Sequence, residues 1–179
     1  SRWDSMNRIT SLLKKELKLF KNVQNINSHK ISHSEPTDIT LLNHVTDWSH
    51  FAILGLANWG ACTAWSCHDG SYIRKNGTQT ILLVTEAFEK LAKVTLKSRG
   101  MPDLPYFVFP HQTEQMAEDD LKPHIIQLTK IIKDEIEKHI IILFILEILE
   151  TGSFSLFLNS FWTKRMKIEE VAMYTKNGI

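Results

Sequence analysis

The sequence predicts an α/β protein with an open parallel sheet and helices on both faces, in a flavodoxin-like three-layer arrangement. Apolar runs of strand length recur at 51–56, 78–85 and 106–109. Helical patterns separate these runs, and such alternation is typical of parallel strands joined by right-handed crossovers. A length of 179 residues fits a single α/β domain with a sizeable core.

The segments before the first clear strand are less regular. Residues 6–21 place apolar side chains at helical spacing and lysines elsewhere, which predicts an amphipathic helix with a solvated basic face. The segment 23–31 has few aliphatic residues and predicts a marginal fourth strand. After a loop around Pro36, a cap at Thr37 or Asp38 predicts a short helix that reaches His44.

The rest of the predicted domain repeats strand, turn and helix. Gly100 closes one helix as a left-handed cap, and Pro123 is tolerated because it lies near the start of another. The predicted elements are a helix over 63–75, a strand over 78–85, a helix over 86–99, a strand over 106–109 and a helix over 119–139.

The C-terminal segment differs in character. Residues 139–149 are apolar nearly all round, but Glu147 and Glu150 interrupt the run well short of the ~20 residues that a membrane span needs. We therefore expect a buried or partner-facing helix, with self-association or edge packing through 140–162. The predicted division is an α/β domain over 1–139 and an apolar helix with an unpatterned tail over 140–179, whose deletion should improve solubility.

Composition and residue spacing limit the expected partners, cellular setting and ligands. A formal net charge of +1 provides no electrostatic reason to expect nucleic acid. Two cysteines do not make a disulfide framework, and no signal pattern is visible, so a reducing, cytoplasmic setting is expected. The histidines of the first fifty residues are too scattered for metal-ligand spacing, and neither a metal nor a cofactor is expected; they are His29, His33, His44 and His50.

The principal functional candidate is the turn between the strand over 51–56 and the helix over 63–75. It contains Gly60, Ala61, Cys62 and Thr63, and open α/β proteins place ligands at such a strand end and helix start. The helix N-terminus stabilises an anion, so Cys62 is predicted to have a pKa below the free-thiol value of about 8.5 and to be alkylated first. Cys67 lies about 140° further round the helix and is predicted to be a buried, inert cysteine.

Other candidates come from neighbouring strand ends, because parallel strands place their carboxyl ends at one edge. Asn58, Thr85, Glu86 and His111 should meet Cys62 there, with Glu86 or His111 handling protons. The alternatives are that Glu86 only favours its helix start and that His111 only shapes a loop. His68 is a further candidate for proton donor or cation, against a structural role in the helix. Asp69 is expected to make a structural hydrogen bond.

An ordered series of motifs carries a family resemblance. Trp59-Gly60-Ala61-Cys62 leads into Thr63-Ala64-Trp65-Ser66-Cys67-His68-Asp69, followed by 80–88, 100–105 and Pro110-His111. This series resembles the UGSC-like family, named for a Sec-Gly-Ser-Cys or Cys-Gly-Ser-Cys motif, over roughly residues 10–139. The resemblance implies a selenoprotein homologue with thiol or selenol chemistry.

Two departures from the family pattern matter. Trp59 stands where the family has its first selenocysteine or cysteine, so the paired chalcogens are absent. The family's first strand is also expected to be missing, because the chain starts at Ser1 and goes directly into a helix. That strand would lie centrally beside 51–56, and its absence should leave unpaired strand edges or force 26–31 to pair with 51–56.

Three interpretations of function remain open. The first is a cysteine-dependent enzyme, an oxidoreductase or lyase, that acts on a small molecule through Cys62. The second is a module that binds an anion or small ligand on Asn58, Trp59, the backbone N–H groups of 60–63, and Thr85. The third is an inactive family member in which Trp59 replaced the first chalcogen. A Cys62→Ser change separates the first two, because it removes the thiol but spares the backbone donors.

Overall fold

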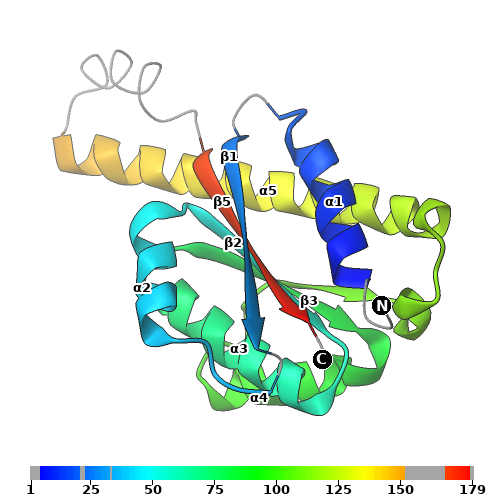
Figure 1. Ribbon diagram of the computed structural model, residues 1–179. Coiled ribbons are helices and arrows are strands. Elements are labelled where there is room, and N and C mark those ends of the chain that lie inside the picture. The colour runs from blue at the N-terminus through cyan, green and yellow to red at the C-terminus, as the bar shows by residue number, and fades with distance from the viewer. Residues whose placement is uncertain (1–4, 21–22, 33, 152–167, 178–179) are drawn as a thin grey trace.

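The computed structural model describes residues 5–20, 23–32, 34–151 and 168–177, and shows a five-stranded parallel sheet between two layers of helices (Figure 1). The strand order is β1-β5-β2-β3-β4. The predicted α/β class is therefore confirmed. The strands are β1 (Val23–Ser32), β2 (Phe51–Ala57), β3 (Gln79–Thr85), β4 (Tyr106–Phe109) and β5 (Ile168–Asn177).

Five α-helices and two 3₁₀ turns complete the described part of the chain. They are α1 (Ser5–Leu17), α2 (Ile39–Trp48), α3 (Gly60–Lys75), η1 (Glu86–Phe88), α4 (Glu89–Ser98), η2 (His111–Glu114) and α5 (Glu118–Thr151). Helix α3 begins three residues earlier than the sequence predicts, because Trp59 is its N-cap. Cys62 therefore lies inside the first turn of the helix rather than before it.

The two faces of the sheet bury separate cores. Residues along β2 alternate between them, as the pleat of a strand requires. Phe51 and Ile53 pack with α1 and α5, whereas Ala52 and Leu54 pack with α2, α3 and α4. All seven residues of β2 are buried, which is typical of a parallel strand covered on both faces.

Strand β5 occupies the central position beside β2. Its Ala172 pairs with Ala52 on one side and with Asn27 of β1 on the other. The expected direct pairing of 26–31 with 51–56 is therefore wrong, and so is the alternative of unpaired strand edges at this position. The order matches a flavodoxin-like sheet in which the last strand of the chain takes the place of the first.

The C-terminal segment also differs from the prediction. Helix α5 runs without a break through residue 139, where the predicted domain boundary lies. Residues 168–177 form a strand inside the sheet rather than an unpatterned tail. Of the segment predicted to self-associate, 152–162 lie outside the described residues.

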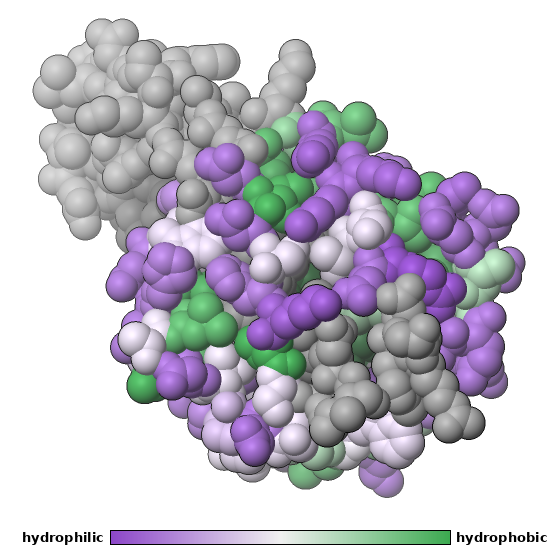
Figure 2. Space-filling model, in the orientation of Figure 1, coloured by the Kyte–Doolittle hydropathy of each residue, from purple (hydrophilic) through white to green (hydrophobic). Residues whose placement is uncertain are grey.

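The described surface is mixed in character. Figure 2 shows hydrophilic residues over much of this side, with apolar residues in separate groups. Exposed apolar side chains occur on several helices, including Val94, Ile126 and Ile141. Within the described ranges, no helix combines the length and apolarity that crossing a membrane requires.

Candidate functional site

The thiol of Cys62 is built into the start of α3. Its Sγ accepts the backbone N–H of Trp59 at 3.1 Å and lies 3.2 Å from the Trp59 carbonyl oxygen, to which the S–H can donate. Thr63 donates both its N–H (2.9 Å) and its hydroxyl (2.6 Å) to the same carbonyl. The contact from the third helical residue back to the N-cap N–H is half of a capping box, with sulfur in the place of a Glu or Gln oxygen.

Both thiols are covered by the surrounding protein. Cys62 is only 2% exposed, although Trp59 beside it is 54% exposed and Gly60 and Ala61 lie at the surface. Cys67 is fully buried, with its Sγ 3.9 Å from the Ala92 carbonyl of α4. The predicted burial of Cys67 is confirmed, and Cys62 is covered almost as completely, so the prediction that Cys62 is alkylated first depends on its ionisation rather than its exposure.

Asn58 links Cys62 to a carboxylate that the sequence analysis missed. Its Oδ1 lies 3.6 Å from Cys62 Sγ, and its Nδ2 donates to Glu114 Oε1 at 3.3 Å. Asn58 follows β2, and Glu114 ends the 3₁₀ turn after β4. The segments that follow these two strands therefore meet through Asn58, although β3 lies between the strands. The strand-end argument that selected His111 also applies to Glu114, three positions later.

Helix α1 holds Glu114 and its turn in place. Ser5 donates its N–H to Glu114 Oε2 at 3.3 Å and its hydroxyl to Oε1. The Arg8 guanidinium donates to the carbonyls of Glu114 (3.0 Å), Thr113 (3.4 Å) and Met116. These contacts join residues more than a hundred positions apart, so no local pattern in the sequence indicates them.

Glu86 and His111 meet each other at the ends of β3 and β4. The His111 backbone N–H donates to Glu86 Oε2 at 3.3 Å, and the His111 ring lies beside Phe88, with 6.4 Å between ring centroids. Thr85 is buried and donates its hydroxyl to the Ala57 carbonyl at 3.4 Å, which ties the ends of β2 and β3 together. The described hydrogen-bond contacts of Cys62 include Asn58 and Trp59, which lie at the end of β2 and the start of α3.

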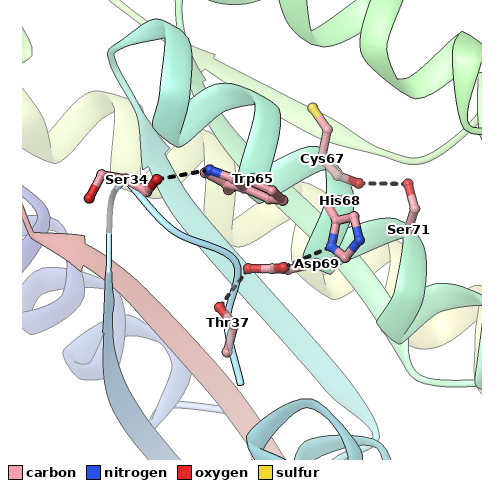
Figure 3. A network of polar contacts seen from close by, with 7 residues as sticks. All are labelled: Ser34, Thr37, Trp65, Cys67, His68, Asp69 and Ser71. Carbon is pink, nitrogen blue, oxygen red and sulfur yellow. Dashed lines mark hydrogen bonds and ion pairs between the residues drawn. The ribbon is translucent and has the colours of Figure 1, made fainter. Parts of the chain in front are cut away.

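His68 belongs to a second polar network in the middle of α3 (Figure 3). Its Nδ1 lies 3.1 Å from Oδ1 of the fully buried Asp69, and its ring packs edge-on against Trp65. Asp69 Oδ2 accepts the Thr37 hydroxyl at 2.6 Å, which confirms the expected structural hydrogen bond of Asp69. His68 lies six residues, or about 9 Å along the helix axis, beyond Cys62. It is thus held by Asp69 rather than placed with the thiol.

The groups linked to one another around Cys62 are therefore a thiol, an amide and a carboxylate. Among the residues with described placement, no group of three or more His, Cys, Asp or Glu side chains could hold a metal ion. A thiol can act as a nucleophile when it ionises, and a neighbouring amide and carboxylate can alter how readily it does so. Trp59, Gly60 and Ala61 form the outer surface of the turn.

The comparisons with known proteins give one match. The model of the UGSC family matches residues 2–137, a span that contains the thiol turn and Glu114 but not strand β5. No curated protein and no solved structure matches the chain. Since the family match covers well over half of the 179 residues, the chain belongs to the UGSC family.

Proposed function

We propose that this protein is a thiol-dependent enzyme that acts on a small molecule, with Cys62 as its nucleophilic or redox-active group. The observation that carries the proposal is the Trp59 N–H donated to Cys62 Sγ at the first turn of a 16-residue helix. An N–H donor and the positive end of a helix both stabilise a thiolate. Cys67 is a matched comparison, because it lies in the body of the same helix.

A disulfide exchange is the simplest reaction that this site supports. The Cys62 thiolate attacks one sulfur of a small-molecule disulfide, a new S–S bond forms, and the other sulfur leaves as a thiolate. Glu86 and His111 lie at neighbouring strand ends and are proposed to handle protons for the leaving group. A reducing, cytoplasmic setting is proposed for the enzyme, because it would keep such a thiol available for reaction.

Single-cysteine variants test the proposal directly. Cys67→Ala retains Cys62, and Cys62→Ala retains Cys67. Each folded variant is treated with iodoacetamide and, separately, with oxidised glutathione, and adducts are followed by mass spectrometry. We expect the variant that retains Cys62 to react at least about tenfold faster, with a thiolate pKa below about 8.5. Equal rates for the two variants would remove the case for nucleophilic catalysis.

Mild oxidation by peroxide provides an independent measurement. The two cysteines are about 7.5 Å apart along the helix axis and about 140° apart around it, so they are too poorly placed for a disulfide. Trp59 supplies no thiol either. The expected product is therefore a sulfenic acid or an adduct at Cys62 rather than a loss of two hydrogens. A loss of two hydrogens would show that the helix opens to pair the cysteines.

A second candidate function is the binding of an anion at the same turn. Gly60 and Ala61 are exposed in the first turn of α3, where backbone N–H groups favour a carboxylate or phosphate. Cys62→Ser should abolish glutathione exchange but largely spare the binding of inorganic phosphate, measured by calorimetry. Phosphate binding without exchange in the wild type would favour a binding module, and neither activity would favour an inactive family member.

A further inference from the structure

The amide of Asn58 has a defined orientation between two groups. Its Nδ2 lies 3.3 Å from Glu114 Oε1, and its Oδ1 lies 3.6 Å from Cys62 Sγ. An ionised carboxylate can only accept hydrogen bonds, so it must face the NH₂ half of the amide. The carbonyl half then faces the sulfur.

This orientation opposes the effect of the helix start on the thiol. The Asn58 carbonyl oxygen has no hydrogen to donate, so it interacts favourably with the S–H form and unfavourably with the thiolate. The Trp59 N–H acts in the opposite direction, because it donates to the sulfur at 3.1 Å. The Trp59 carbonyl oxygen, 3.2 Å from the sulfur, also favours the S–H form, but its position is fixed by the backbone. Reversing the Asn58 amide would replace an acceptor by a donor beside the sulfur. The amide orientation therefore decides part of the balance between thiol and thiolate.

We propose that Glu114 is a positioning residue for Cys62: by fixing the Asn58 amide, it keeps the carbonyl oxygen toward the sulfur and limits how much thiolate the helix start produces in the resting protein. The inference rests on the proposed function, since it concerns the same thiol. It adds a residue that controls when the nucleophile forms. A substrate that takes over the Glu114 carboxylate, or the Asn58 NH₂ group, would release the amide and favour the thiolate.

The carboxylate is well placed for this role because both of its oxygens have partners. Oε1 accepts from Asn58 and from the Ser5 hydroxyl, and Oε2 accepts from the Ser5 N–H. Arg8 fixes the backbone of the same turn through three carbonyls. Rotation of the carboxyl group would break contacts with the buried Ser5 at the start of α1. The start of α1 therefore supports the position of Asn58.

The test is a titration of Cys62 by the ultraviolet absorbance of its thiolate, in a Cys67→Ala background. Glu114→Gln is expected to lower the midpoint by about one pH unit, which is about tenfold more thiolate below the midpoint. The neutral side chain can itself donate, so Asn58 can turn its NH₂ group toward the sulfur. An unchanged or higher midpoint would overturn the proposal. Glu89→Gln is the matched control, because this carboxylate pairs with Lys93 on α4 and is not assigned to the site, and it should leave the midpoint in place.

A double-mutant cycle separates positioning from a direct effect of charge. Asn58→Ala removes the carbonyl acceptor and should lower the midpoint by itself. In that background Glu114→Gln should change little, because its effect passes through the amide. A full shift in the Asn58→Ala background would show that Glu114 acts by charge alone and would overturn the proposal.

Two further outcomes remain informative. If Glu114→Gln fails to fold, Asn58→Ala alone decides, and an unchanged midpoint in that variant overturns the proposal. Ser5→Ala removes a hydroxyl donor to Glu114 but leaves the Asn58 contact, so it should lower stability without moving the midpoint. The titration does not require Cys62 to react. A shifted midpoint with no disulfide exchange would therefore contradict the proposed function and support this inference.

Discussion

Thr37 donates a hydrogen bond of 2.6 Å to Asp69, and this contact joins the loop after β1 to the middle of α3 (Figure 3). Asp69 is fully buried, and its other carboxylate oxygen lies 3.1 Å from His68 Nδ1. Nearby, the Trp65 indole N–H donates to the Ser34 carbonyl at 3.1 Å. The loop therefore has two polar attachments to the helix that carries Cys62.

Loss of the Thr37 hydroxyl should destabilise the protein. Thr37→Val removes one donor from a buried carboxylate, and we expect the free energy of unfolding to fall by about 1–3 kcal/mol. Urea unfolding measures this change. Thr46→Val is the matched control, because its hydroxyl donates to the Asn43 carbonyl at an exposed site, and it should cost less than about 0.5 kcal/mol. Equal losses in the two variants would show that the Thr37 contact carries no special weight.

The central position of β5 predicts a severe effect of proline. Ala172 pairs with Asn27 and Ala52, so Ala172→Pro removes a backbone donor from a strand that is paired on both sides. We expect a loss of about 3 kcal/mol or more, measured by thermal unfolding. Ala172→Gly keeps the N–H and should cost only about 0.5–1 kcal/mol.

The same position reverses an earlier expectation about the C-terminal segment. Deletion of 140–179 would remove β5, and with it the described partner of β1 and one of the two partners of β2. The deleted chain should therefore lose cooperative unfolding rather than gain solubility. A truncated protein that unfolds cooperatively at the wild-type temperature would contradict this placement of β5.

Close packing between β2 and β3 predicts that Gly55 cannot be enlarged. A Cβ atom at Gly55 would lie 2.7 Å from Leu83 Cβ and 3.0 Å from the Leu83 carbonyl oxygen. Gly55→Ala should therefore destabilise the protein by about 1–3 kcal/mol, because overpacking displaces the neighbouring strand. Gly60→Ala is the control, since nothing lies within 4 Å of its added Cβ. In chemical denaturation, the free energy of unfolding of Gly60→Ala should equal or slightly exceed that of the wild type. A loss of stability as large as that of Gly55→Ala would be inconsistent with the described packing.

A partly buried histidine, His139, predicts lower stability in mild acid. Burial, and then the nearby Arg74 and His50, lower the pKa of His139 below its ordinary value of 6.5. The unfolded chain therefore binds a proton near pH 6.5 that the folded protein does not accept. The contribution of His139 to stability is present above that pH and is lost as the pH falls toward the lowered pKa.

The free energy of unfolding, measured above and below pH 6.5, checks that stability falls as the pH is lowered. His139→Gln cannot titrate and still offers an acceptor to Gln79, whose Nε2 lies 2.7 Å from His139 Nδ1. The variant should lose less stability on acidification than the wild type does. A residual slope is expected from His29, whose pKa burial also lowers. An identical pH dependence in both proteins would exclude the role of His139.

Local patterns in the sequence predict much of the fold because they depend on neighbouring residues. Apolar runs identify β2, β3 and β4, and glycine and cap positions identify the ends of several helices. The turn that carries Cys62 is recognisable for the same reason, since strand, glycine and helix start follow one another within a few residues. The segment 23–31, which composition predicts only as a marginal strand, forms the full strand β1 (Val23–Ser32). It does so because β5 pairs with it along its length.

By itself, the sequence determined the α/β class, the family and the thiol at a helix start, all of which are encoded in short ordered motifs. Only the tertiary structure decided that β5 fills the centre of the sheet, since strand pairing joins distant segments and the run Ile168–Asn177 lacks the apolar pattern of a central parallel strand. It also decided that Glu114 faces Asn58 across 56 positions and that Cys62 is covered. Both a contact between residues far apart in the sequence and the burial of a side chain depend on how the helices and strands pack. Local periodicity does not specify that packing.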